Sequence, residues 1–260
     1  MGYNKIISYG NTVEIYEYEK DIITLKRSKR PRKDYSHDED LGARGKDTLS
    51  QRQLGKRQDN ARRASMAFRR LVACNLGGSS RPLLVTLTYG ENFTDLAGAY
   101  RHFSSCIQSL RHKYGKDFKY VCVPEFQQRG AVHFHALFWE LPEEVFLSQR
   151  EDRTIDRLWG HGYVFMKQTD GDEKLSFYLS KYMAKAFTDP RLKNQKCYVA
   201  SRNILRPVVK AGFSPLWPIL DDYNIMEEAV VDKTYNTKWL GKGRHRIYKL
   251  SATIPNAEKS

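Results

Sequence analysis

The sequence predicts an α+β fold, in which helices pack on the faces of a β-sheet. Strand-like and helix-like segments alternate along residues 81–190. Two neighbouring strand-like segments, 119–126 and 131–139, form a predicted hairpin in the middle of that alternation. Basic and polar sequence flanks it on both sides. We therefore predict a basic N-terminal extension at 1–80, a central domain at 81–190, and a C-terminal extension at 191–260 that packs on the same domain.

The N-terminal extension begins with two predicted strands, at residues 13–18 and 22–25, because apolar and polar side chains alternate there. A run of basic residues follows at 26–33 and includes Lys29 and Arg30. Such a run is commonly a solvated and mobile segment. In a chain of this charge it is equally an element that binds phosphates, and both interpretations stay open.

A helix is predicted from Ser50 to Asn75. Its apolar face is expected to contain Ala64, Met66, Ala67, Leu71 and Val72. Its basic face is expected to contain Arg52, Lys56, Arg57, Arg62, Arg63, Arg69 and Arg70. The pattern is typical of an amphipathic surface helix, or of a helix that lies along a nucleic-acid backbone. We favour the second interpretation, with Arg62, Arg63, Arg69 and Arg70 as DNA-binding residues, because only Asp59 opposes the basic residues.

The central domain is predicted to hold four strands and three helices. The strands are expected at 83–89, 119–126, 131–139 and 162–167, and the helices at 95–114, 142–158 and 175–187. Thr94 is the expected N-cap of the first helix and Gly115 ends it. In the C-terminal extension, short strands are expected at 198–202, 207–210 and 244–250.

The strand at 131–139 carries two histidines, His133 and His135, within an apolar run. Side chains of a strand alternate between faces, so both imidazoles point the same way and Phe134 points into a core. Two such imidazoles on a rigid strand can bind a metal ion. Taken alone, they are also typical of two histidines at the edge of a core.

The loop of the hairpin decides whether a carboxylate joins the two histidines. A three-residue loop from Gln128 to Gly130 places the glycine at the left-handed position that such loops favour. Counting outward then puts Glu125 opposite His133, on the same face. A carboxylate and two imidazoles suit Mg²⁺ or Mn²⁺. A two-residue loop would instead shift the register by one and turn Glu125 to the other face.

The helix at 175–187 carries a stripe of two tyrosines and two lysines, because Tyr178, Lys181, Tyr182 and Lys185 follow helical spacing. Leu175, Leu179, Met183 and Ala186 form another face that can pack on the sheet. One interpretation of the stripe is a solvated face with half-buried tyrosines. The other is chemical: a tyrosine acts as nucleophile, and the neighbouring ammonium groups favour its phenolate and stabilise charge on a phosphate.

Composition favours a nucleic-acid partner. The 260 residues include 44 Lys and Arg against 30 Asp and Glu, a formal charge of +14. The four cysteines stand singly, which argues against a cysteine zinc site or a disulfide framework. No secretory signal pattern opens the sequence, and no apolar run approaches the roughly 18 residues of a membrane span. We therefore expect a cytoplasmic chain with no membrane partner.

Three signatures in one order carry a resemblance: Leu-Val-Thr-Leu-Thr-Tyr at 84–89, His-Phe-His at 133–135 and Tyr-Leu-Ser-Lys-Tyr-Met-Ala-Lys at 178–185. Together they resemble the motifs of rolling-circle replication initiators of the HUH endonuclease superfamily. The likeness is to the initiators of small single-stranded DNA phages, including microviruses, and of related plasmids, and it covers about residues 83–187. Phe134 fills the place of the bulky residue between the two histidines.

The resemblance implies a role for each motif residue. His133, His135 and Glu125 would be the metal ligands. Tyr178 would attack a phosphodiester of single-stranded DNA at a replication origin, forming a 5′-phosphotyrosine and a free 3′-OH. Tyr182 would act as a second tyrosine that transfers and closes the strand. Lys181 would lie beside the metal and the phosphate.

The resemblance also implies a fold: a central antiparallel sheet flanked by helices, similar to an RNA-recognition motif, with the histidines on a central strand. No phosphate-binding Walker motif is present, so the chain would depend on a host helicase to unwind DNA. The resemblance further implies a host DNA polymerase as partner, in a bacterial or archaeal cytoplasm. Two alternatives stay open. One is a transposase or relaxase of the same superfamily. The other is a non-catalytic protein that binds an origin or single-stranded DNA.

Overall fold

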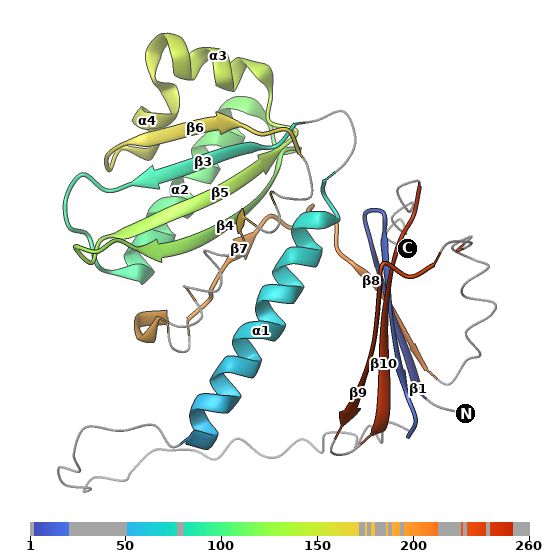
Figure 1. Cartoon of the computed structure of the whole chain (residues 1–260). Helices are drawn as coiled ribbons and strands as arrows, with labels where there is room; N and C mark the ends of the chain where they lie inside the picture. Colours follow the sequence, from blue (N-terminus) through green and yellow to red (C-terminus); the bar gives the residue numbers. More distant parts are fainter. Residues whose placement is uncertain are drawn as a thin grey trace, which may run out of the picture. The chain divides into compact units, whose positions relative to one another are not determined.

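The structure of the protein is a computed structural model, and it describes residues 3–20, 51–76, 81–171, 175, 178–179, 186, 189–192, 195–212, 225, 228–237 and 240–251. Its fold is α+β, as predicted, and contains two five-stranded sheets (Figure 1). The chain divides into two compact units. One unit comprises residues 1–7, 13–59 and 209–250, and the other comprises residues 8–12, 60–208 and 251–260.

The first sheet has the order β8-β1-β2-β10-β9, so strands from both ends of the sequence pair in it. Its strands are β1 (Tyr3–Tyr9), β2 (Thr12–Tyr18), β8 (Val208–Gly212), β9 (Val231–Thr237) and β10 (Gly241–Lys249). The predictions of β2, β8 and β10 are confirmed, whereas β1 and β9 were not predicted. The strand expected at 22–25 lies outside the described residues.

The second sheet has the order β6-β3-β5-β4-β7, and every pairing in it is antiparallel. Its strands are β3 (Leu83–Thr88), β4 (Lys119–Phe126), β5 (Val132–Trp139), β6 (Val164–Gln168) and β7 (Val199–Ala200). β5, which carries the two histidines, is the middle strand. This confirms the central antiparallel sheet and the predicted position of the histidines.

One face of the second sheet packs against helix α2 (Leu96–Tyr114), which lies behind the sheet in Figure 1. The ring of Phe134 on β5 lies 5.4 Å from that of Phe103 on α2, between ring centroids, and is fully buried. The helix ends at Gly115, as predicted. The predicted N-cap is wrong by one residue: the carboxylate of Asp95, not Thr94, accepts the backbone N–H of Ala97 at 3.0 Å.

Helix α1 (Gln51–Ala73) matches the predicted helix closely. Its apolar face differs from the prediction, because Phe68, Leu71 and Val72 are buried whereas Met66 and Ala67 are exposed. The helical repeat explains the difference: residues three and four apart share a face, and Met66 lies two residues before Phe68. Phe68 therefore anchors this helix in the core, a role that the sequence analysis missed.

The single helix predicted at 142–158 is wrong. The structure has two helices there, α3 (Glu143–Asp152) and α4 (Thr154–Trp159), joined at Arg153 with a left-handed φ of 55°. The break has a local cause. The side-chain oxygen of Gln149 accepts the backbone N–H of Ile155 at 2.7 Å, so it satisfies a donor at the start of α4.

The segment predicted as a helix at 175–187 is described at four residues, Leu175, Tyr178, Leu179 and Ala186, and all four are helical. Leu175, Leu179 and Ala186 are buried and belong to the main hydrophobic core, as predicted for the packing face. Tyr178 is 43% exposed. Within the described part of the chain, no helix is both long and apolar enough to cross a membrane.

Candidate metal and DNA-cleavage site

The hairpin of β4 and β5 has the predicted three-residue loop. The backbone N–H of Gln127 donates to Ala131 O at 2.9 Å, and the N–H of Gly130 donates to Gln127 O at 2.8 Å. Gly130 adopts a φ of 94°, which glycine tolerates better than other residues. Glu125 consequently pairs with His133, so the predicted register is confirmed.

Arg129 fastens this loop to the end of β3. Its guanidinium donates to the carbonyl oxygens of Gly90 at 3.1 Å and Tyr89 at 2.5 Å. The backbone N–H of Val132 also donates to Phe93 O at 2.8 Å. The loop that sets the position of Glu125 is therefore held from outside the hairpin as well as from within it.

The two histidines and the carboxylate lie together on the face of the sheet opposite α2. His135 Nε2 lies 2.8 Å from Glu125 Oε2, and the rings of His133 and His135 are stacked with centroids 4.7 Å apart. The three predicted metal ligands are thus brought together by one hairpin.

Polar neighbours that the sequence analysis missed orient the two imidazoles. Thr88 Oγ1 lies 3.3 Å from His133 Nε2, and Thr86 Oγ1 lies 3.5 Å from His135 Nδ1. The side-chain amide of Gln127 lies 3.3 Å from His133 Nδ1. The alternation of threonine and leucine in β3 was the available signal, because β3 pairs with β5 and both threonines face the histidines.

Burial keeps His133 neutral. Burial first, and then the adjacent His135, lower the pKa of this imidazole, which lies at about 4. Glu125 opposes the shift and Arg129 adds to it. At neutral pH His133 is therefore uncharged and retains a nitrogen lone pair, which a metal ligand requires.

The chemistry of these donors suits a divalent cation, since one carboxylate and two imidazoles are accepted by Mn²⁺ and, less readily, by Mg²⁺. The described residues nevertheless include no group of three His, Cys, Asp or Glu side chains arranged to hold a metal. The carboxylate of Glu125 is instead hydrogen-bonded to His135. The Mg²⁺ or Mn²⁺ prediction therefore stays a prediction.

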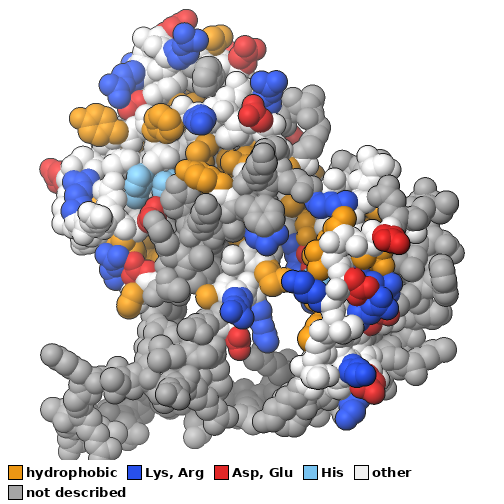
Figure 2. Space-filling view, viewed as in Figure 1, with side chains coloured by type: hydrophobic (Ala, Val, Ile, Leu, Met, Phe, Trp, Pro, Cys, Tyr) orange, Lys and Arg blue, Asp and Glu red, His pale blue; other side chains and the backbone are white. Residues whose placement is uncertain are grey.

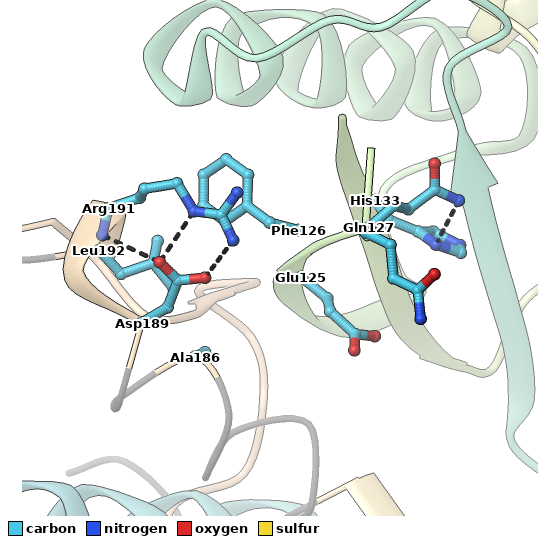
Figure 3. A pocket seen from close by; sticks show the side chains of 9 residues that line it. Glu125, Phe126, Gln127, His133, Ala186, Asp189, Arg191 and Leu192 are labelled. Carbon is cyan, nitrogen blue, oxygen red and sulfur yellow. Dashed lines mark hydrogen bonds and ion pairs between the residues drawn. The ribbon is translucent and has the colours of Figure 1, made fainter. Parts of the chain in front are cut away.

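A pocket of about 540 Å³ opens beside His133 and Glu125 (Figure 3). It is lined by Glu125, Phe126, Gln127, Gln128, His133, Ala186, Asp189, Arg191 and Leu192. Ala186 belongs to the segment that carries Tyr178. Arg191 forms an ion pair with Asp189 at 2.5 Å, and its guanidinium lies 3.9 Å from the centroid of the Phe126 ring. Arg191 belongs to a 3₁₀ turn (Pro190–Leu192) and Asp189 directly precedes it; neither residue was predicted as part of the site.

The other predicted site residues have different positions. Tyr178 is exposed and is not among the described residues that line the pocket. Arg62 and Arg63 on α1 are exposed, whereas Arg69 and Arg70 are partly buried. Lys29, Arg30, Lys181, Tyr182 and Lys185 lie outside the described residues.

A match to a known protein family falls on the region that holds this site. No curated protein and no solved structure matches the chain. Residues 82–187, less than half of the chain, match a family model described as replication-associated protein ORF2/G2P. All three signature segments, at 84–89, 133–135 and 178–185, fall within the match. The match supports a replication-initiator family for this region and a role in DNA replication.

Proposed function

We propose that the protein is a replication-initiator endonuclease that nicks single-stranded origin DNA by tyrosine transesterification and later rejoins the strand. A host helicase and a host DNA polymerase would act with it in the cytoplasm. The observation that carries the proposal is the pocket beside β5, because it combines Glu125 and His133 with Ala186 from the segment that contains Tyr178.

Tyr178 is the proposed nucleophile. Its phenolic oxygen would form a bond to the phosphorus of a phosphodiester while the bond from phosphorus to the 3′ oxygen breaks. The 3′ oxygen takes up a proton and leaves as a free 3′-OH, and the 5′ end remains linked as phosphotyrosine. A phenol has a pKa of about 10. The positively charged ammonium groups of Lys181 and Lys185 would favour its phenolate form. Attack by a 3′-OH on the phosphotyrosine reverses the reaction, with Tyr182 as a proposed second acceptor.

Glu125, His133 and His135 are the residues that would hold Mg²⁺ or Mn²⁺. The bound ion would supply Lewis acidity at the scissile phosphate. The neutral state of His133 supports this assignment, and so do the threonines that orient both rings. To ligate an ion, Glu125 and His135 would exchange their mutual hydrogen bond for bonds to it.

The test uses a single-stranded oligonucleotide from the replicon's origin, incubated with protein and Mn²⁺. We expect nicking and a covalent adduct that mass spectrometry maps to Tyr178. Tyr178→Phe should abolish first-strand nicking, whereas the exposed tyrosine variant Tyr235→Phe should nick as wild type does. Survival of nicking in Tyr178→Phe would contradict the nucleophile assignment. If the wild type bound the oligonucleotide but failed to cleave it with any divalent metal, a non-catalytic DNA-binding protein would be the better description.

A further inference from the structure

Two large aromatic side chains stand exposed at the edge of the second sheet. Phe165 on β6 is 59% exposed, and Tyr163, directly before β6, is 69% exposed. An edge strand of a soluble domain usually presents small or charged side chains to solvent. Two adjacent exposed aromatics therefore indicate a surface that binds something.

The sheet register places these rings on the same face as the histidines. Phe165 pairs with Thr86, and Thr86 pairs with His135. In the neighbouring row, the N–H of Thr88 donates to Tyr163 O at 2.9 Å, and Thr88 pairs with His133. Only β3 separates β6 from β5, so the two rows span about 10 Å at the usual strand spacing. In Figure 2, hydrophobic side chains lie over the region of β6, next to histidines.

A lysine continues this exposed row along β6. Lys167 pairs with Leu84, which places its exposed side chain on the same face as Phe165 and Tyr163. The row thus offers two flat rings followed by a cation, in a chain with a formal charge of +14. Alternate strand residues are about 6.6 Å apart, which is room for two neighbouring bases that are unstacked from each other.

We propose that Tyr163 and Phe165 form a stacking platform for unpaired DNA bases, with Lys167 contacting the backbone phosphate. The platform would hold the single strand whose phosphodiester lies at the histidines. Aromatic rings stack on any unpaired base, whereas a duplex hides the base faces, so this surface selects single strands without reading sequence. The inference rests on the proposed function in one respect: that function supplies the single-stranded substrate.

The test compares two fluorescent 20-nucleotide probes by anisotropy, oligo-dT and an oligonucleotide of abasic sites with the same backbone. The variant Tyr163→Ala/Phe165→Ala should bind oligo-dT about 10- to 100-fold more weakly than wild type. Its binding to the abasic probe should change by less than about 2-fold, because no base is present to stack. Tyr163→Phe/Phe165→Tyr should restore binding, and Leu147→Ala, an exposed apolar residue on α3, is the matched control.

The outcomes test the stacking platform and the endonuclease separately. Equal losses on both probes, or no loss on either, would overturn the platform. Lys167→Ala should weaken binding to both probes by a similar factor, since it contacts phosphate. Nicking of origin DNA with an adduct on Tyr178 is scored separately. Base-dependent losses without any nicking would keep the platform and reject the endonuclease. Nicking without base-dependent losses would do the reverse.

Discussion

The two faces of the second sheet differ sharply, although the same strand supplies both. Toward α2, β5 presents Val132, Phe134, Ala136 and Phe138, all of them at most 4% exposed. Toward the other side it presents His133 and His135, with Glu125 opposite His133, and then the buried Leu137 and Trp139. One face is closed by apolar packing. The other face holds polar side chains beside a pocket, and these side chains form hydrogen bonds with one another.

Each face also holds a stacked pair of histidines, which sharpens the comparison. His133 and His135 come from one strand and lie beside a carboxylate. His102 on α2 and His161 stack with centroids 3.9 Å apart, and Tyr89 OH lies 2.9 Å from His102 Nδ1 within an aromatic cluster. The stacking itself therefore does not identify a site. The neighbouring side chains identify it. Glu125 lies at a pocket, where a carboxylate can help to bind a metal ion, whereas Tyr89 is buried in the core.

The largest effect is expected from a substitution on the face of the second sheet that packs against α2. Phe134→Ala should lower the free energy of unfolding by about 3–5 kcal/mol, since a fully buried ring is replaced by a cavity. Phe165→Ala removes the same ring from the exposed edge and should change it by no more than about 0.5 kcal/mol. Urea denaturation measures both. Similar losses for the two variants would refute the difference drawn between the faces.

A substitution on the face that carries the two histidines should reduce activity and leave the free energy of unfolding nearly unchanged. His133→Ala is expected to reduce Mn²⁺-dependent nicking at least about 100-fold, because it removes a proposed ligand. Its unfolding free energy should fall by less than about 1 kcal/mol. Single-turnover cleavage and urea denaturation give the two quantities, with the exposed His112→Ala as control. Cleavage at the wild-type rate would remove His133 from the site.

A smaller effect is expected at the turn that aligns the faces. Gly130→Ala should cost about 1–2 kcal/mol, because its φ of 94° is unfavourable for alanine. Steric conflict adds little, since the nearest atom to an added Cβ would be Thr94 Cγ2 at 3.7 Å. Gly212→Ala is the matched control, with nothing within 4 Å of the added carbon. Thermal or urea unfolding of the two variants should separate them, and equal costs would show that the loop conformation is not constrained.

The smallest effect concerns acid. Partial desolvation by its neighbours, and then the stacked His102, hold the pKa of His161 below its usual value of 6.5, although the side chain is largely exposed. Below pH 6.5 the unfolded state therefore takes up a proton more readily, and stability falls as the pH falls toward the folded-state pKa. His161→Phe keeps a ring and should lose less stability between pH 7 and 5. Because His161 is exposed, the difference in Tm should be only about 1 °C. Identical pH profiles would contradict this role.

Local rules explain which parts of the site were predictable from the sequence. The register of β4 and β5 follows from loop length and a glycine, so Glu125 was placed correctly opposite His133. The orienting threonines required the pairing of β3 with β5, which join across more than forty residues. Asp189 and Arg191 reach the pocket from a turn that has no periodic pattern.

The errors in the fold have similar causes. The break between α3 and α4 depends on one glutamine side chain that reaches across the junction, and no hydrophobic period records such a contact. Strand β9 is polar and exposed along most of its length, and it is defined by its pairing with β10. Strand β1 was missed although Gly10 and Asn11, which follow it, are typical turn residues.

The clamp formed by Arg129 has a consequence for anyone who edits this protein. Surface loops usually tolerate added residues, yet an insertion here that shifts the register of β4 and β5 by one would turn Glu125 to the other face of the sheet. An insertion beside Arg129 would also move its guanidinium relative to the carbonyl oxygens of Tyr89 and Gly90. Tags, linkers and split points therefore belong elsewhere on the surface. The length of this turn fixes the register of β4 against β5, so it is as much a part of the site as the side chains that it aligns.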